Sequence, residues 1–181
     1  MRILIHGLNF SPEKIGIGKY TGEMAAWLAQ AGHEVRVVTA PPYYPDWKVQ
    51  PPYHTWKFQR ETWQGVEIFR CPLWVPAKPS GLKRIVYLLS FAISSSYIMS
   101  RQVKWKPEIV FCVAPAIFCA PSSLRTARKS NAVSWLHIQD FELDAATNLG
   151  MVKSGNVITR FAAQWERTIL SSFDRVSSIS K

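Results

Sequence analysis

Apolar residues along the chain alternate between short β-branched runs and stretches with helical spacing. The runs at 3–8 and 34–39 are typical of buried strands, and between them apolar side chains recur every three or four residues from Ile17 to Ala31. Gly32 follows at a position where helices often end. The pattern predicts a strand, a helix and a second strand parallel to the first.

The same alternation continues to the end of the chain, with one interruption. Two short β-rich runs within 56–71 flank a turn at 63–65, which predicts a β-hairpin. Further strands are predicted at 108–114, 132–138 and 175–180, and further helices at 122–129 and 158–171. The fold class is therefore α/β, a Rossmann-like, doubly wound and mostly parallel sheet, in which ligands bind beyond the carboxyl ends of the strands.

One predicted helix, Leu82–Met99, has two interpretations. Residues 85–100 carry no charge, but the run is interrupted by serines and is shorter than the roughly 20 apolar residues that a membrane-spanning helix needs. It is either a buried crossover helix between two strands or an amphipathic helix that lies at a membrane surface.

Charge is distributed unevenly along the chain. Of 181 residues, 22 are Lys or Arg and 12 are Asp or Glu, which gives a net charge of +10. The segment 68–139 holds ten basic residues and one acidic residue, Glu108. The middle of the chain therefore predicts an anionic partner, unless these side chains only face solvent. The three cysteines show no paired spacing, which argues against disulfides and a zinc site and favours a reducing compartment.

A glycine-bearing loop follows the first strand. Gly16, Gly18 and Gly22 lead into the first helix, where backbone amides can approach a phosphate. The glycine spacing differs from the dinucleotide fingerprint, and the chain has no Walker loop, so nicotinamide, flavin and P-loop enzymes are excluded. Alternatively, the glycines only allow close packing of the helix.

Candidate chemistry also follows the second strand and the strand at 132–138. The first of these loops holds Tyr43, Tyr44 and Trp47, whose rings suit stacking on a sugar or packing of the loop itself. The second brings together a histidine, an amide and carboxylates suited to acid/base chemistry, namely His137, Gln139, Asp140 and Glu142. The alternative is a core histidine beside a helix cap. Nucleophile-elbow and H-E-x-x-H motifs are absent from the sequence.

Taken in order, four segments resemble the N-terminal half of family-4 glycosyltransferases of the GT-B fold. They are Gly16-x-Gly18, the helix end Trp27-Leu28-Ala29-x-x-Gly32-His33-Glu34-Val35, Gly65-Val66-x-Ile68-x-Arg70-Cys71-Pro72 and His137-x-Gln139-Asp140. The resemblance runs from residue 1 to residue 181. It implies that 1–181 is the N-terminal, acceptor-side Rossmann-like domain, and that the C-terminal domain, with its paired glutamates, is missing. The final strand has no covering helix after it, so we also expect the chain to be cut from a longer protein.

The resemblance implies an enzyme that transfers a hexose, with retention, from a GDP- or UDP-sugar bound by the missing domain to an acceptor hydroxyl. No further cofactor and no metal ion are expected. His137 and Asp140 would act as catalytic residues. The loop residues Gly16, Gly18, Lys19 and Tyr20 would lie near donor and acceptor, and the acceptor would contact Tyr43, Tyr44, Trp47, Gln139 and Glu142.

Acceptors in the polysaccharide pathways of this family are often polyprenyl-diphosphate saccharides, which implies a role in bacterial exopolysaccharide synthesis. The basic segment then predicts an anionic membrane partner, with Lys83, Arg84, Arg101, Lys104 and Lys106 facing the bilayer. The expected location is the cytoplasm, peripheral at the inner face of the cell membrane. The rival hypothesis is a basic module that binds membrane or nucleic acid without catalysis. Because no nucleic-acid motif is present, nucleic acid is not an expected partner.

Overall fold

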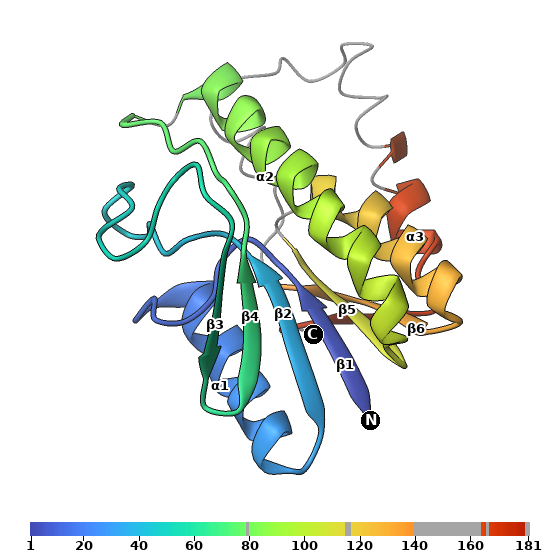
Figure 1. Cartoon of the computed structure of the whole chain (residues 1–181). Coiled ribbons are helices and arrows are strands. Elements are labelled where there is room, and N and C mark those ends of the chain that lie inside the picture. The colour runs from blue at the N-terminus through green and yellow to red at the C-terminus, as the bar shows by residue number, and fades with distance from the viewer. Residues whose placement is uncertain (79, 115–116, 140–163, 166, 180–181) are drawn as a thin grey trace.

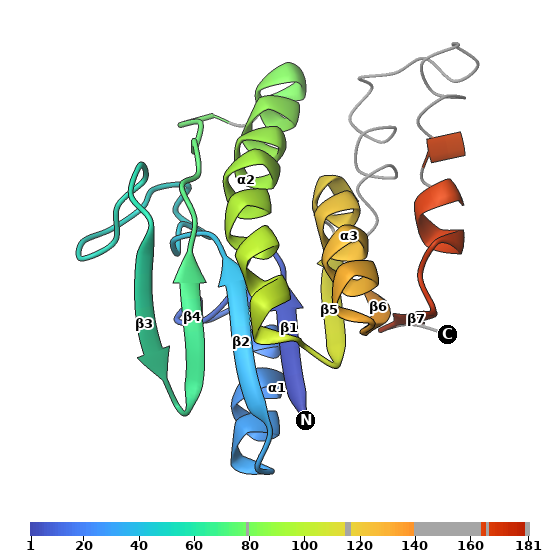
Figure 2. The same cartoon turned by 45° about the vertical axis from the view of Figure 1, so that its right-hand side comes forward.

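The structure is a computed structural model that describes residues 1–78, 80–114, 117–139, 164–165 and 167–179. Its centre is a sheet whose strand order is β3-β4-β2-β1-β5-β6-β7 (Figures 1 and 2). Neighbouring strands are parallel, except that β3 and β4 form an antiparallel hairpin. The strands are β1 (Arg2–His6), β2 (Glu34–Thr39), β3 (Gln59–Trp63), β4 (Val66–Arg70), β5 (Ile109–Ala114), β6 (Val133–Ile138) and β7 (Arg175–Ser178).

Helices cover both faces of the sheet. Helix α1 (Gly16–Gln30) packs on one face, and α2 (Gly81–Gln102) and α3 (Ala120–Ser130) pack on the other (Figure 2). Two short 3₁₀ turns, η1 (Val103–Trp105) and η2 (Ile117–Cys119), follow α2 and β5. Residues 164–165 and 167–171 are helical and precede β7.

The sheet has its topological switch point at β1. Helix α1 connects β1 to β2 on one side, whereas α2 carries the chain from β4 across to β5 on the other side of β1. In open α/β sheets, ligands bind outside the carboxyl ends of the strands at such a point. The loop that follows β1 is therefore the expected place for a ligand.

The predicted α/β class is confirmed, and so is the hairpin at β3 and β4. Strand β2 has the predicted bounds, but β1 ends at His6 rather than at Leu8. Period-two alternation explains the two core layers, because Leu4 and Val38 face α2 and α3 while Ile5 and Val37 face α1.

The described residues also show where the cysteines lie and what the helices and acidic or metal-ligating side chains can form. The side chains of Cys71, Cys112 and Cys119 are all buried. Among the described residues, no helix has the length and hydropathy needed to cross a membrane. In the same part of the chain, no group of three His, Cys, Asp or Glu side chains is placed to hold a metal ion.

His6 is a buried titratable residue at the end of β1. Its Nδ1 lies 2.8 Å from the Ser123 hydroxyl of α3, and its Nε2 lies 3.0 Å from the Ser95 hydroxyl of α2. The ring is fully buried, and this burial lowers the pKa of His6 to about 3. A neutral imidazole therefore joins β1 to both helices on this face.

We expect stability to fall as the pH drops below the ordinary histidine pKa. The pKa of His6 is lowered in the folded protein, so between pH 7 and 5 the unfolded chain takes up a proton that the folded chain does not. This linkage lowers the free energy of unfolding by about 2 kcal/mol over that interval. Urea denaturation at pH 7 and pH 5 measures it, with His6→Gln as the control that lacks this contribution. Equal pH dependence of the two proteins would contradict the assignment.

Candidate functional site

Two loops meet at the carboxyl edge of the sheet, beside the switch point. We call residues 9–18, which follow β1, the glycine loop, and residues 41–47, which follow β2, the aromatic loop. Both loops lie at the ends of neighbouring parallel strands, so their side chains share one edge (Figure 1). Two buried groups of opposite charge hold them together.

Glu13 is the first of these groups. Its carboxylate accepts hydrogen bonds from the backbone amides of Tyr43 and Tyr44, each at 3.3 Å, and from the Asn9 amide group at 3.0 Å. Burial raises the pKa of Glu13, while these hydrogen bonds and the positive charge of Arg70 act in the opposite direction. Glu13 of the glycine loop therefore fixes the backbone of the aromatic loop at Tyr43 and Tyr44.

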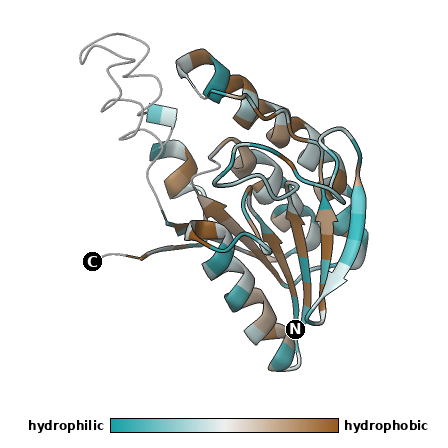
Figure 3. Ribbon diagram, turned by 90° about the vertical axis from the view of Figure 1, so that its left-hand side faces the viewer, coloured by the Kyte–Doolittle hydropathy of each residue, from teal (hydrophilic) through white to brown (hydrophobic). Residues whose placement is uncertain are grey.

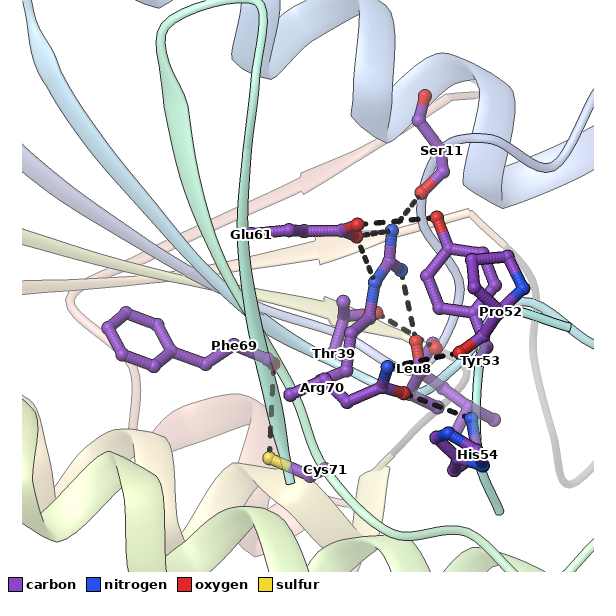
Figure 4. A network of polar contacts seen from close by, with 12 residues as sticks. Leu8, Ser11, Thr39, Pro52, Tyr53, His54, Glu61, Phe69, Arg70 and Cys71 are labelled. Carbon is purple, nitrogen blue, oxygen red and sulfur yellow. Dashed lines mark hydrogen bonds and ion pairs between the residues drawn. The ribbon is translucent and has the colours of Figure 1, made fainter. Parts of the chain in front are cut away.

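Arg70 is the second group, at the end of β4, and its side chain is only 1% exposed. Its Nε donates to the Glu61 carboxylate at 2.7 Å, its Nη1 donates to the Ala40 carbonyl at 3.0 Å, and its Nη2 donates to the Ser11 carbonyl (Figure 4). The guanidinium also lies 5.2 Å from the ring centroid of Tyr53. One buried cation thus holds the start of both loops.

Arg70 also belongs to the basic segment 68–139, and composition alone does not predict this structural role. Long-range contacts at sequence separations of 30 and 59 residues define it, and no local pattern encodes them. Two sequence signals were available: Arg70 stands in one of the motifs of the family resemblance, and it continues the period-two alternation of Val66 and Ile68.

The glycines serve close packing, which was one of the two interpretations of the loop. Gly18 and Gly22 are buried on α1, and an added Cβ would collide with Glu13 at the first and with Ser11 at the second. Gly16 has a φ of +62°, a conformation that favours glycine, and a Cβ there would lie 4.0 Å from the ring of Tyr44. Of the predicted loop residues, Gly18 is therefore shielded.

Just after the glycine loop, Lys19 and Tyr20 carry side chains that a ligand can reach. Both are exposed in the first turns of α1, and the Lys19 ammonium lies 3.9 Å from the Glu23 carboxylate. A pair of this exposure contributes little to stability. The Lys19 ammonium can therefore leave Glu23 and bind a phosphate with little loss of stability.

The predicted acceptor aromatics divide into two groups. The hydroxyl of Tyr43, a residue only 5% exposed, bonds with the Asn9 amide at 3.1 Å and with the Tyr87 hydroxyl of α2. Trp47 packs its ring against those of Tyr43 and Tyr87, at 5.7 and 5.6 Å between centroids. Tyr44, by contrast, is 41% exposed. The first group anchors the aromatic loop to α2, and Tyr44 presents an accessible ring.

The end of β6 contributes Gln139 and His137. The Gln139 amide donates to the Thr21 hydroxyl of α1 at 3.4 Å, which places Gln139 beside the glycine loop. His137 faces the α1 side of the sheet, where its Nδ1 lies 2.9 Å from the Ser177 hydroxyl of β7, and burial lowers its pKa. Asp140 and Glu142 lie outside the described residues.

His137 also lines a groove of about 360 Å³ between α1 and the sheet. The groove is mainly apolar, with Met24, Trp27 and Leu28 on one wall and Phe111 and Trp135 on the other. The ring of His137 packs against Phe111 at 5.5 Å. His137 therefore lies in this groove, on the α1 side of the sheet.

The predicted membrane-facing residues cluster at the two ends of α2. Lys83 is exposed and Arg84 half-buried in its first turn, and Arg101, Lys104 and Lys106 are exposed at or after its end. A helix of 22 residues is about 33 Å long, so the two basic clusters are far apart. They flank the outer surface of the helix rather than forming one patch.

Comparison with known proteins identifies the class of this fold and site. Residues 16–181 match the family model described as the Glycosyl transferase 4-like domain, which is most of the chain. The chain belongs to this glycosyltransferase family, as its motifs predicted.

A particular relative is also similar along the entire chain. It is the Escherichia coli (strain K12) protein described as "Putative colanic acid biosynthesis glycosyl transferase WcaI", which is 49% identical over 183 residues. The alignment covers 100% of this chain and 45% of that protein. The chain thus spans somewhat less than half the length of this relative.

Proposed function

We propose that this chain is the acceptor-side half of a glycosyltransferase of exopolysaccharide synthesis. The enzyme transfers a hexose, with retention, from a GDP- or UDP-sugar to a lipid-linked saccharide. The observation that carries the proposal is the convergence of the glycine loop, the aromatic loop and Gln139 at the switch point of the sheet. The family membership and the description of the relative as a colanic acid enzyme support the same reaction class.

Each exposed group at the edge has a chemical role in this proposal. Tyr44 and Tyr20 offer rings that can stack on sugar faces, and Gln139 can exchange hydrogen bonds with a sugar hydroxyl. Lys19 pairs with a phosphate of the donor or acceptor. His137 and Asp140 orient the acceptor hydroxyl or contact the donor sugar, as the family resemblance implies.

The nucleotide sugar is bound by the other half of the enzyme. The chain covers 45% of its relative, which leaves ample length for a second domain of similar size in a full-length protein. A donor held there would face the carboxyl edge across a cleft. Neither a metal ion nor a further cofactor is required in this proposal.

A lipid-linked acceptor requires the enzyme to work at a membrane. A polyprenyl-diphosphate saccharide presents its sugar at the cytoplasmic face of an anionic bilayer. Each Lys or Arg near such a surface is attracted by about 1 kcal/mol. The basic clusters at the ends of α2 therefore support peripheral docking at the inner face of the cell membrane.

The test is a transfer assay with the full-length protein. Incubation with labelled UDP- and GDP-hexoses and polyprenyl-diphosphate saccharides should give a glycosylated lipid whose anomeric configuration matches that of the donor. The reaction should continue in EDTA. The 181-residue chain alone should give no product, because it lacks the donor half. Turnover by the chain alone would contradict this division of roles.

A further inference from the structure

The outward face of α2 is apolar along nearly its whole length. Its exposed residues recur at helical spacing, from Leu82 at 76% exposed through Ile93 at 71% to Tyr97 at 50%. The opposite face packs into the core through residues such as Phe91 and Met99. We call the exposed set the outer stripe; it comprises Leu82, Ile85, Val86, Leu89, Ile93 and Tyr97.

A surface helix of a globular protein normally turns a charged or polar face to solvent. Two exposed serines lie beside the outer stripe, Ser96 and Ser100, and both satisfy their hydroxyls within the helix. Ser96 donates to the Ile93 carbonyl and Ser100 donates to the Tyr97 carbonyl, both at 2.7 Å. Because these donors already have partners, this face can leave water with a small polar penalty.

One aromatic residue outside α2, Phe58, extends the stripe. The Phe58 ring, just before β3, lies 5.8 Å from the Tyr97 ring, and Trp56 is 71% exposed in the same segment. The Arg101 guanidinium lies 4.6 Å from the Tyr97 ring centroid and marks the basic end of the surface. Figure 3 shows hydrophobic segments along this helix after a hydrophilic turn near its start. Large exposed apolar surfaces of this kind mark interaction sites.

The first half of α2 projects past the carboxyl edge of the sheet (Figure 1). On the buried side of this half, Tyr87 bonds with Tyr43 of the aromatic loop. The outer stripe and the candidate site are therefore fixed to the same end of the molecule. A partner surface that bound the outer stripe would therefore also fix the position of the candidate site.

We infer that the outer stripe inserts into the interfacial layer of an anionic lipid bilayer, with α2 parallel to the membrane plane. The inference rests on the proposed function, because insertion of the stripe would bring the enzyme to its lipid-linked acceptor. Charge identifies the occupant. Every charged side chain between the start of α2 and Lys106 is basic, and these side chains lie at the two ends of the stripe. Anionic headgroups match them, and apolar residues between basic ends are typical of interfacial helices.

A second copy of the chain fits this surface poorly. Two α2 helices packed antiparallel through the outer stripe would bring Lys83 of each copy towards Arg101 of the other. Helix α2 contains no Asp or Glu to pair with them. Like charges placed this way oppose association.

Flotation of the full-length protein with vesicles tests the inference. The probes are vesicles of phosphatidylcholine alone and vesicles with about one third phosphatidylglycerol. The stripe variant carries Leu82→Gln, Leu89→Gln and Ile93→Gln, none of which removes a buried side chain. We expect the wild type to bind the anionic vesicles and the stripe variant to bind at least about a hundredfold more weakly, because the transfer of three apolar side chains is lost.

A matched control replaces three exposed apolar residues elsewhere, by Trp27→Gln, Val133→Thr and Val176→Thr, and should bind like the wild type. Neutralising Lys83, Arg101 and Lys104 should remove the preference for anionic vesicles. Equal binding by the stripe variant and the wild type would overturn the inference. So would a dimer that the stripe variant dissociates while vesicle binding is absent. Neither outcome depends on sugar transfer, so failure here is distinct from failure of the proposed function.

Discussion

Replacing Arg70 with Met is expected to lower the free energy of unfolding by about 3 kcal/mol. The substitution keeps much of the side-chain volume but leaves the Ala40 and Ser11 carbonyls without their donor and Glu61 without its buried partner. Ala40 immediately precedes the aromatic loop, and Ser11 lies within the glycine loop. Arg70 is therefore a positioning residue, and acceptor affinity should fall in the variant even where it remains folded.

Arg60→Met in the same hairpin is the matched control. Arg60 pairs with Glu67, but its side chain is 69% exposed, and exposed pairs contribute about 0–1 kcal/mol. Chemical denaturation of both variants measures the difference. A loss no larger for Arg70→Met than for Arg60→Met would show that the buried network does not hold the loops.

Asp140→Asn in the full-length enzyme is expected to lower turnover by about 10²–10⁴-fold, the range for a positioned acid/base group. Asp140 follows Gln139, which the structure places beside α1 and the glycine loop. The amide keeps the size of the carboxylate and removes its ability to accept a proton. Steady-state kinetics on the purified variant measure the effect, together with its melting temperature.

Asp174→Asn is the control for this prediction. The Asp174 carboxylate accepts hydrogen bonds from the backbone amide of Ser134 at 2.8 Å and from the Ser134 hydroxyl, and these bonds lower its pKa. The variant should lose stability while turnover per folded molecule is unchanged. If Asp140→Asn instead behaves like Asp174→Asn, Asp140 caps a helix and does not act on substrate.

The strands were predictable because their signals are local. Each buried strand is a compact apolar or β-branched run, and β2 lies at its predicted bounds. The order of the strands, which sets the switch point at β1, depends on long-range pairing that these local signals do not contain. Helix α2 was harder, because its apolar residues cover two faces at once. The sequence left a crossover helix and an interfacial helix open, whereas the structure shows a crossover helix whose outward face is also apolar.

The sequence identified candidate residues in the loops after the strands, but it could not tell which of their side chains are exposed. Tyr43 and Tyr44 are adjacent, and residue type alone cannot tell which ring faces solvent. Tyr43 is buried because Tyr87, distant in sequence, reaches its hydroxyl. Gly18 is shielded because Glu13 folds back against it. These contacts depend on how α1 and α2 pack on the sheet, which local patterns do not contain.

The central claim is that the carboxyl edge of this chain binds the acceptor and not the nucleotide sugar. Equilibrium binding to the 181-residue chain tests it most directly, with a detergent-dispersed polyprenyl-diphosphate saccharide and with UDP- and GDP-hexoses as the probes. We expect saturable binding of the lipid-linked saccharide, weakened about tenfold or more by Tyr44→Ala but not by Trp27→Ala, and no binding of the nucleotide sugars. Saturable binding of a nucleotide sugar that Tyr44→Ala abolishes, without acceptor binding, would contradict the claim.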